Sequence, residues 1–209
     1  MNKLILLRHG QSQWNLENRF TGWKNVPLTE KGEFEAKNAG ELIKKNKIKI
    51  DIVFSSVLER ANRTAEIAVK QAGLNNLFES NKLLMIKSDK LNERDYGDLV
   101  GLNKQETINK FGKDQVHIWR RSYNTPPPNG ESLKDVVERV SPYFRENIKP
   151  LIDKGENILI VAHGNSLRAM MIELEMYKPE AISSIELPTG SPLCIHLDQG
   201  RLVDFEYLN

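Results

Sequence analysis

Two short apolar runs stand out in the pattern of hydrophobic and polar positions along the chain. One covers Lys3 to Leu7, which is apolar from Leu4 onward, and the other covers Ile158 to Ala162. Apolar runs of this length are typical of strands that are buried on both faces of a sheet. A weaker signal predicts a third strand at Ile52 to Phe54. Leu193 to Leu197 and Leu202 to Tyr207 flank the turn pair Gln199-Gly200 and predict a hairpin at the edge of the sheet.

Helix signals fill much of the sequence between these two runs. Polar residues that can cap a first turn, such as Thr29 and Ser132, precede the longer candidates. The predicted helices are Glu30 to about Lys45, the segment from Ser56 as N-cap through Val69, Asn103 to Phe111, Asp114 to Ser122, and the segment from Ser132 toward Ile148. Because strands and helices alternate, the sequence predicts an α/β sandwich.

Composition narrows the class of protein. The chain has 209 residues, of which 39% are hydrophobic, and we expect one domain over residues 1–209 with a well-buried core. Its 30 basic and 28 acidic residues nearly balance, which argues against the broad basic surface of a nucleic-acid binder. Any anion site is therefore expected to be local. The segment Pro126 to Gly130 is predicted to be a surface loop.

The cysteine content and the N-terminus indicate the compartment. Cys194 is the single cysteine and has no partner for a disulfide or a zinc site, which favours a reducing environment. The first apolar run is interrupted by Arg8 and His9, so it is too short for a signal peptide or a membrane span. We therefore expect a soluble, cytoplasmic protein with no membrane partner. No group of Asp, His or Cys has the spacing of metal ligands, and no metal is expected.

Both apolar runs end in a histidine followed by a glycine. His9-Gly10 follows the first run and His163-Gly164 follows the second. In open α/β sheets, ligands bind beyond the carboxyl ends of the strands, so neighbouring strands would bring both imidazoles to one pocket. The residues after His163 have the character of a helix start, whose free N–H groups attract anions. A single Arg-His-Gly unit would more simply be a strand end without function, but two strands that each end in His-Gly, the second of them joined to a helix start suited to anions, favour a phosphate site.

The chemistry of imidazole suits phosphoryl transfer. A neutral histidine can attack a phosphate ester without bringing negative charge toward the dianion. The second histidine, protonated, and Arg8 can neutralise charge that develops on the phosphoryl oxygens. These residues therefore predict an enzyme that forms a phosphohistidine.

At these positions the sequence resembles a known family. Leu7 to Asn15 resembles the signature of the histidine phosphatase superfamily. Further blocks resemble the bisphosphoglycerate-dependent phosphoglycerate mutases in family order, and they are Asn18 to Trp23, Leu91 to Gly97, Gly101 to Lys104, Trp119 to Arg121 and Ala162 to Arg168. The resemblance implies the phosphoglycerate mutase-like fold, a three-layer α/β sandwich with a mostly parallel central sheet.

The resemblance also implies residue roles. His9 is expected to be the phosphorylated nucleophile and Glu93 the proton donor and acceptor, while Arg8, Arg60 and His163 surround the transferring phosphoryl group. The residues expected to bind the substrate are Asn15, Thr21, Gly22, Arg94, Tyr96, Lys104, Arg120, Arg121, Gly164 and Asn165. Without the resemblance, Arg60 would be taken for a surface residue. Arg120 and Arg121 would be taken for a solvated helix face, from which at least one could point away.

Two departures from the family bear on assembly and on side reactions. The stretch Thr125 to Gly130 is shorter than in many members, which leaves the choice between monomer and homodimer open. The chain also stops at Asn209, without the tail that helps to close the site in longer relatives. A less closed site lets water reach phosphohistidine, so we expect appreciable phosphatase side activity.

The sequence thus predicts an isomerase that interconverts 3-phosphoglycerate and 2-phosphoglycerate, the small-molecule substrates, in glycolysis and gluconeogenesis. Phosphorylated His9 carries the reaction, and 2,3-bisphosphoglycerate primes it. One alternative is a broad-specificity phosphatase of the same superfamily, which would need no primer; Lys104, Arg120 and Arg121 weigh against it. The other is a catalytically silent phosphate-binding or phosphoprotein-binding module, and the intact His9 and Glu93 weigh against that.

Overall fold

Four parallel strands and an antiparallel C-terminal hairpin form the central sheet in the computed structural model, which describes all residues from Met1 to Asn209. The strands are β1 (Asn2–Arg8), β2 (Ile52–Ser55), β5 (Ile86–Lys87), β6 (Ile158–Ala162), β7 (Pro192–Asp198) and β8 (Arg201–Tyr207). Their order is β5-β2-β6-β1-β7-β8, with β7 antiparallel to β1 and to β8. A separate two-stranded ladder joins β3 (Phe78–Glu79) to β4 (Lys82–Leu83).

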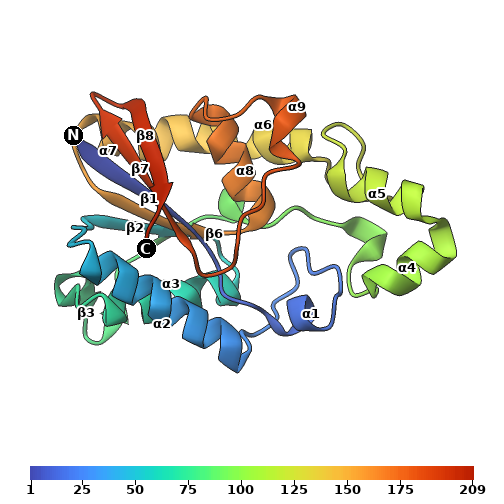
Figure 1. Cartoon of the computed structure of the whole chain (residues 1–209), viewed down its shortest axis with the longest axis horizontal. Helices are drawn as coiled ribbons and strands as arrows, with labels where there is room; N and C mark the ends of the chain where they lie inside the picture. Colours follow the sequence, from blue (N-terminus) through green and yellow to red (C-terminus); the bar gives the residue numbers. More distant parts are fainter.

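Helices cover both faces of this sheet. The α-helices are α1 (Gln13–Leu16), α2 (Glu30–Lys45), α3 (Glu59–Gln71), α4 (Lys104–Phe111), α5 (Lys113–Arg121), α6 (Leu133–Tyr143), α7 (Lys149–Asp153), α8 (Gly164–Glu173) and α9 (Pro179–Ile182). Short 3-10 turns are η1 (Asn75–Leu77), η2 (Asp89–Leu91) and η3 (Gly97–Leu99), and η4 (Phe144–Ile148) is π-helical. Figure 1 shows α2 and α3 on one face of the sheet and α6, α7 and α8 on the other.

The alternation of side chains along β1 supplies two separate cores. Leu4 and Leu6 pack with α6 and α8, whereas Ile5 and Leu7 pack with α2 and α3. Every one of these side chains is buried because helices cover both faces, which is why the strand reads as a continuous apolar run. The predicted three-layer sandwich with a mostly parallel sheet is confirmed.

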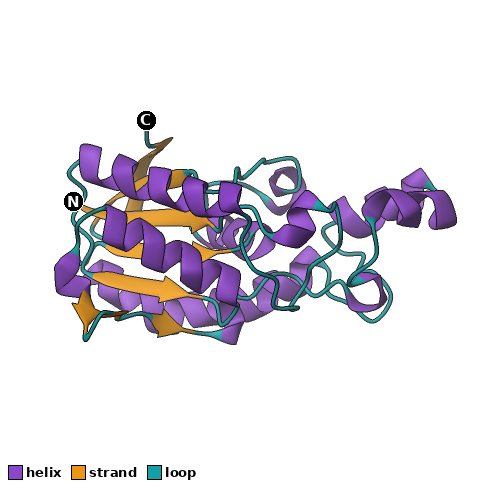
Figure 2. Cartoon of the chain, turned by 90° about the horizontal axis from the view of Figure 1, so that it is seen from below, coloured by secondary structure: helices purple, strands orange, loops and turns teal.

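The helices α4 and α5 lie outside the sandwich. Figure 2 shows the parallel strands pointing toward the end of the molecule at which these two helices project. A small third cluster of Phe20, Leu99 and Val116 packs α5 against the segments that follow β1 and η2. This arrangement places a helical cover next to the carboxyl ends of the strands.

Local capping signals predicted several boundaries correctly. The helix α2 spans Glu30–Lys45 as expected, and Thr29 Oγ1 accepts a hydrogen bond from Gly32 N at 3.1 Å. Ser132 and Asp135 form a reciprocal capping box at the start of α6. The run toward Ile148 continues as η4, after Pro142, which lacks the N–H that an α-helix interior needs. The predicted C-terminal hairpin is β7–β8, with β8 at the edge of the sheet.

Two local expectations need correction. Ser56 does not cap α3, which begins at Glu59 after Leu58; the Ser56 hydroxyl instead lies 2.8 Å from His163 Nε2. Within the loop Pro126 to Gly130, which is otherwise at the surface, Pro127 is buried. The Ser56 side chain is engaged by a contact with a residue far away in sequence, which local sequence does not reveal. No helix of the structure has the length and apolarity needed to cross a membrane.

The first turn of α2 packs directly against the segment that follows β1. Gln11 O accepts a hydrogen bond from Thr29 N at 2.9 Å. A Cβ atom on Gly32 would overlap Gln11 O, and a Cβ atom on Gly10 would overlap the Gly32 carbonyl. Glycine at both positions therefore permits the close approach that holds the segment after His9.

We expect Gly32→Ala to lower the free energy of unfolding by about 1–3 kcal/mol, the usual cost of inserting a group into filled space. A decrease in the free energy of unfolding would point to the overlap with Gln11, because replacing glycine by alanine inside a helix otherwise stabilises a protein by about 0.5–1 kcal/mol. Urea unfolding at neutral pH measures the change. Lys37→Ala, on the exposed side of the same helix, is the control and should stay within about 0.5 kcal/mol of the parent. Unchanged or higher stability of Gly32→Ala would contradict the packing argument.

Candidate active site

The parallel pairing of β1 with β6 brings the two histidines together. Arg8 is opposite Ala162 in the register, and His9 N donates to Ala162 O at 3.0 Å. The two strands therefore end at the same edge of the sheet, and the ring centroids of His9 and His163 are 4.9 Å apart. The prediction that neighbouring strands would juxtapose these imidazoles is confirmed.

The hydrogen bonds of His9 identify its tautomer. Nδ1 lies 2.7 Å from Gly10 O, and a carbonyl oxygen can only accept, so Nδ1 carries the proton. Arg60 Nε donates to Nε2 at 3.3 Å, which requires a lone pair on Nε2. Burial, followed by the charges of Arg60 and Arg8, holds the pKa of His9 well below its usual value. At neutral pH, His9 is an uncharged imidazole with Nε2 free to act as a nucleophile.

His163 is also neutral in the free site. Burial lowers its pKa first, and the charge of Arg60 lowers it further. The expectation of a protonated second histidine concerns the site with a phosphoryl group bound, whereas in the site without an anion cations surround the ring and keep it neutral. Its Nε2 pairs with Ser56 Oγ at 2.8 Å, while its buried Nδ1 has no hydrogen-bond partner.

Two arginines flank His9. Arg60, in the first turn of α3, is 1% exposed and donates to Gly22 O at 2.8 Å and Lys24 O at 2.9 Å. Burial lowers the pKa of Arg60 to about 10, so it stays charged at neutral pH. Arg8 donates from Nη1 to Leu187 O at 2.8 Å, and its buried Nε has no partner. Arg60 is thus a buried site residue, as the resemblance implied, and not a surface residue.

Glu93 lies on the irregular segment between η2 and η3. Its Oε1 accepts from Arg94 N at 2.7 Å, Asn165 N at 3.2 Å and Asn165 Nδ2 at 2.9 Å. Burial raises the pKa of Glu93, but these hydrogen bonds and the charges of Arg8 and Arg60 more than offset it, so the pKa lies below its usual range. Glu93 is therefore a carboxylate in the free site.

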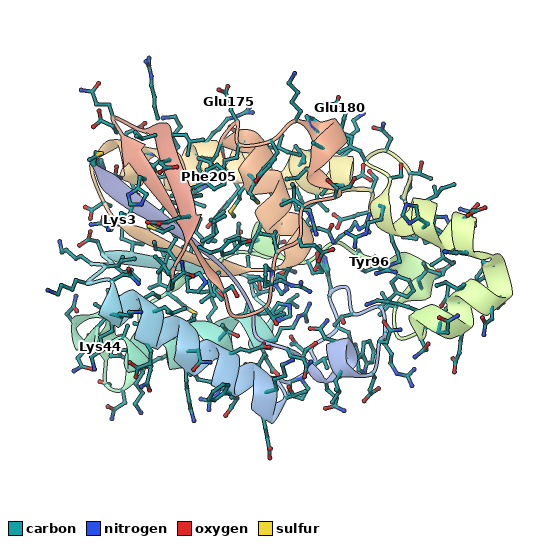
Figure 3. The ribbon with its side chains drawn as sticks, in the orientation of Figure 1. Lys3, Lys44, Tyr96, Glu175, Glu180 and Phe205 are labelled. Atoms are coloured by element: carbon teal, nitrogen blue, oxygen red, sulfur yellow. The ribbon has the colours of Figure 1, made fainter.

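Two adjoining cavities open at this edge of the sheet. The inner one contains His9 and Arg60, the outer one is formed around Arg120 and Arg121, and Arg8, Glu93, Tyr96 and Lys104 line both. Tyr96 lies where the sandwich meets α4 and α5 (Figure 3). The helices that project from the sandwich supply Lys104, Arg120 and Arg121 to the wall of the outer cavity.

The outer cavity is strongly cationic. Arg121 donates from Nη1 to Ser183 O at 3.0 Å, and its Nη2 lies 3.5 Å from Glu186 Oε1. Both Arg120 and Arg121 line the cavity, so the alternative in which one of them points away is wrong. Arg94 lies behind, with its guanidinium 4.7 Å from the Tyr96 ring and a hydrogen bond of 3.0 Å to Arg120 O.

The structure brings the predicted site residues together. Apart from His163 and Arg94, which are buried behind the walls, each of them lines one or both cavities, and these are Arg8, His9, Asn15, Thr21, Gly22, Arg60, Glu93, Tyr96, Lys104, Arg120, Arg121, Gly164 and Asn165. No group of three or more His, Cys, Asp or Glu side chains gathers in the geometry of a metal site.

Sequence reasoning missed several residues of the site. Arg19 and Phe20 line the inner cavity, and Arg168 and Glu186 line the outer one. Arg19, Phe20 and Arg168 belong to the blocks that carry the resemblance, so their positions could have been included. Glu186 follows α9 in a segment without any sequence signal.

Comparisons with known proteins find relatives over nearly the whole chain. The family model described as "Histidine phosphatase superfamily (branch 1)" matches residues 4–207. A protein named phosphoglycerate mutase from Schizosaccharomyces pombe is 51% identical over 209 residues, which is 100% of this chain and 96% of the relative. A protein named 2,3-bisphosphoglycerate-dependent phosphoglycerate mutase from Parvibaculum lavamentivorans is 47% identical over 208 residues, covering 99% and 96% of the two chains.

Solved structures share the fold. The mycobacterial glucosyl-3-phosphoglycerate phosphatase in complex with VO3 superposes with a TM-score of 0.82 at 24% identity, covering 100% of this chain and 99% of that one. The alpha-ribazole phosphatase from Shigella flexneri gives a TM-score of 0.80 at 24% identity, with 99% and 96% coverage. At this level of identity the likeness concerns the fold alone.

The neutral state of both histidines predicts how stability depends on pH. Folding holds the pKa of His9 and His163 below its unfolded value near 6.5, so the unfolded chain binds more protons as the pH falls. The free energy of unfolding should therefore be maintained above about pH 6.5 and decrease below it, by about 1.4 kcal/mol per pH unit for each histidine. Urea unfolding between about pH 7.5 and about pH 5.5 measures this slope.

His9→Asn separates the histidines from the remaining titratable groups. The variant keeps one buried neutral histidine, so its slope below about pH 6.5 should be smaller by about 1.4 kcal/mol per pH unit. Identical slopes in the parent and the variant would show that His9 titrates normally in the folded chain.

Proposed function

The chain belongs to the histidine phosphatase superfamily, and we propose that it interconverts 3-phosphoglycerate and 2-phosphoglycerate, with 2,3-bisphosphoglycerate as primer. The curated relatives that bear the mutase name match nearly the full length of both chains and support this choice. The observation that carries the proposal is geometric: Glu93 lines both a cavity with a neutral, buried histidine and a cavity rich in cations. The inner cavity serves phosphoryl transfer, and the outer cavity binds the rest of an anionic substrate.

His9 is the nucleophile in this proposal. Its Nδ1–H is engaged by Gly10 O, so the lone pair on Nε2 forms the bond to phosphorus. The Glu93 carboxylate removes the proton of a substrate hydroxyl while that oxygen attacks phosphohistidine and the N–P bond breaks. Protonated Glu93 then gives this proton to the leaving oxygen of the bisphosphate, as His9 Nε2 forms the new N–P bond and the P–O bond breaks. The proton is returned within each cycle.

The residues around His9 are suited to a phosphoryl group. Arg8 Nε and His163 Nδ1 are buried without partners, and phosphoryl oxygens would give both an acceptor. Ser56 Oγ accepts from Leu58 N at 3.2 Å and lies 2.8 Å from His163 Nε2. In the tautomer in which Ser56 donates its proton to Nε2, Nδ1–H is the donor toward the anion. A bound dianion also raises the pKa of His163, and the protonated form then belongs to the liganded site.

The outer cavity accounts for a mutase rather than a simple phosphatase. Phosphoglycerate carries a carboxylate, and the bisphosphate carries a second phosphate that does not react. Lys104, Arg120 and Arg121 line the outer cavity and supply the cations for these groups. A phosphatase that transfers the phosphoryl group to water and lets the rest of the substrate leave would have no need of this second set of cations.

Location and organisation complete the proposal. We place the protein in the cytoplasm, where glycolysis and gluconeogenesis use this reaction, and treat residues 1–209 as one domain because one family model covers residues 4–207. The transfer needs no metal in this mechanism, since arginines and histidines neutralise the phosphoryl charge. Either a monomer or a homodimer is compatible with a site built within a single chain.

The decisive assay follows conversion of 3-phosphoglycerate to 2-phosphoglycerate with excess chelator, with and without catalytic 2,3-bisphosphoglycerate, while free phosphate is measured in parallel. We expect primer-dependent isomerisation that exceeds phosphate release and resists the chelator. Partition of labelled phosphohistidine to water as well as to phosphoglycerate would show the expected side activity. Phosphate release without isomerisation would replace the mutase by a phosphatase, and silence in both assays would leave a binding module.

Replacing the proton-transfer group gives an independent test. Glu93→Gln keeps the shape of the side chain but removes the base, so we expect kcat for isomerisation to fall by about 10²–10⁴-fold with a smaller change in KM. Steady-state kinetics on 3-phosphoglycerate measures this. The substrate-site variant Arg121→Gln is the contrast, because it should raise KM more than it lowers kcat. An active Glu93→Gln enzyme would rule out the role of Glu93.

A further inference from the structure

Arg139 lies outside both cavities yet contacts the backbone that carries Glu93. It projects from α6, and its side chain is 13% exposed. Nη1 donates to Lys90 O at 2.7 Å and to Asn92 O at 3.1 Å, and Nη2 donates to Glu93 O at 3.0 Å. Three carbonyls of one short segment therefore share a single guanidinium.

Glu131 completes this arrangement. Its carboxylate receives Arg139 Nε at 2.8 Å and Nη2 at 2.9 Å. The same carboxylate accepts from Asp95 N at 2.8 Å, and Glu131 N donates to Asp95 O at 2.9 Å. A guanidinium has five N–H groups, and here all five are used. We call Arg139 and Glu131 together the Arg139–Glu131 pair.

The segment that carries Glu93 is fixed by side-chain contacts, which include the hydrogen bond from Arg94 Nη2 to Arg120 O, and not by regular secondary structure. Residues 93–96 belong to neither a helix nor a strand, so no ladder of backbone hydrogen bonds fixes them. The remaining contact to the Glu93 carbonyl comes from Trp23 Nε1, which donates to it at 2.6 Å. The Trp23 ring also lies over Arg139, with 5.6 Å between its centroid and Cζ. Removal of the guanidinium would leave Trp23 Nε1 as the remaining donor to the Glu93 carbonyl.

We infer that the Arg139–Glu131 pair positions Glu93 for proton transfer, without touching the substrate. The carboxylate of Glu93 accepts hydrogen bonds from Arg94 N and Asn165, and its main-chain carbonyl accepts one from Arg139. A shift of about 1 Å in a proton-transferring group is enough to cost about 10²-fold in rate. The inference rests on the proposed role of Glu93 as proton donor and acceptor.

Lysine cannot replace arginine at this position. A lysine at 139 keeps the positive charge, but its ammonium has three donors in a compact head and lacks the planar fork that spans Glu131 and the three carbonyls. Arg139→Lys therefore changes geometry while it preserves charge. Glu131→Gln is the second variant, since it weakens the fork and leaves Arg139 in place.

Arg145 offers a matched control. It forms a similar two-point pair with Glu173, at 2.6 Å and 2.8 Å, on the same helical run but in neither cavity. Arg145→Lys therefore removes an arginine fork without contact with the Glu93 segment. Its kinetics should equal those of the parent.

The test compares two kinds of leaving group in the phosphorylation of His9. Phenyl phosphate releases a basic oxygen that needs a proton, which Glu93 gives after taking it up from water, whereas 2,4-dinitrophenyl phosphate releases an oxygen that needs none. We expect Arg139→Lys and Glu131→Gln to slow transfer from phenyl phosphate about 10–100-fold and transfer from 2,4-dinitrophenyl phosphate less than about 3-fold. In the isomerisation of 3-phosphoglycerate, kcat should fall by a similar factor, with KM within about 3-fold of the parent.

Each outcome decides the inference. Equal losses with both aryl phosphates in the folded variants, checked by circular dichroism below their unfolding midpoints, would reduce the pair to a structural role. If the variants transferred the phosphoryl group from phenyl phosphate as fast as the parent, the pair would have no role in positioning Glu93. If the parent enzyme fails to isomerise 3-phosphoglycerate, the proposed function falls, while the ratio between the two aryl phosphates still reports on the pair.

Discussion

The parallel register between β1 and β6 is the constraint on which the site depends. It sets Arg8 opposite Ala162, and the next residue on each strand is a histidine. Because side chains alternate across a sheet, a slip of one residue in β1 would bring apolar side chains to the wrong core and carry His9 away from His163. The two buried cores, one on each face, make such a slip costly. Packing far from the chemistry thereby fixes the distance between the two imidazoles.

Burial of this edge gives the residues their protonation states. Desolvation and the nearby arginines keep His9 and His163 neutral, while hydrogen bonds keep Glu93 ionised. The free site thus holds a nucleophile, a base and a concentration of positive charge with few anions to balance it. A phosphorylated ligand supplies the missing negative charge, and its binding energy includes relief of repulsion among the cations.

The sequence predicted those features that are encoded locally. Thr29 and Ser132 indicate helix starts because their side chains cap the first turns of α2 and α6. The apolar run of β6 was placed without error because a strand buried on both faces has no polar position. Ser56 was misassigned because a serine after a strand can cap a helix or pair with a distant side chain, and only the fold decides. Arg139 and Glu186 carried no signal for the same reason, since their partners are far away in sequence. The site residues were identified through a resemblance, and the physical pattern alone reached only the two histidines and Arg8.

Isomerisation makes a further demand that hydrolysis does not. After the first transfer, the bisphosphate has to be retained while its other phosphate comes to His9, and before and after that stage water has to be kept from phosphohistidine. Glu93 stands at the boundary of the inner and outer cavities, so a single carboxylate can serve both transfers. Lys104, Arg120 and Arg121 are carried by α4 and α5, which lie outside the sandwich, whereas His9 and His163 follow strands of the sheet. In the proposed reaction, retention of the ligand and reaction at phosphorus therefore draw on different parts of the fold. The packing of Val116 with Phe20 and Leu99 and the hydrogen bond from Arg94 Nη2 to Arg120 O join those parts.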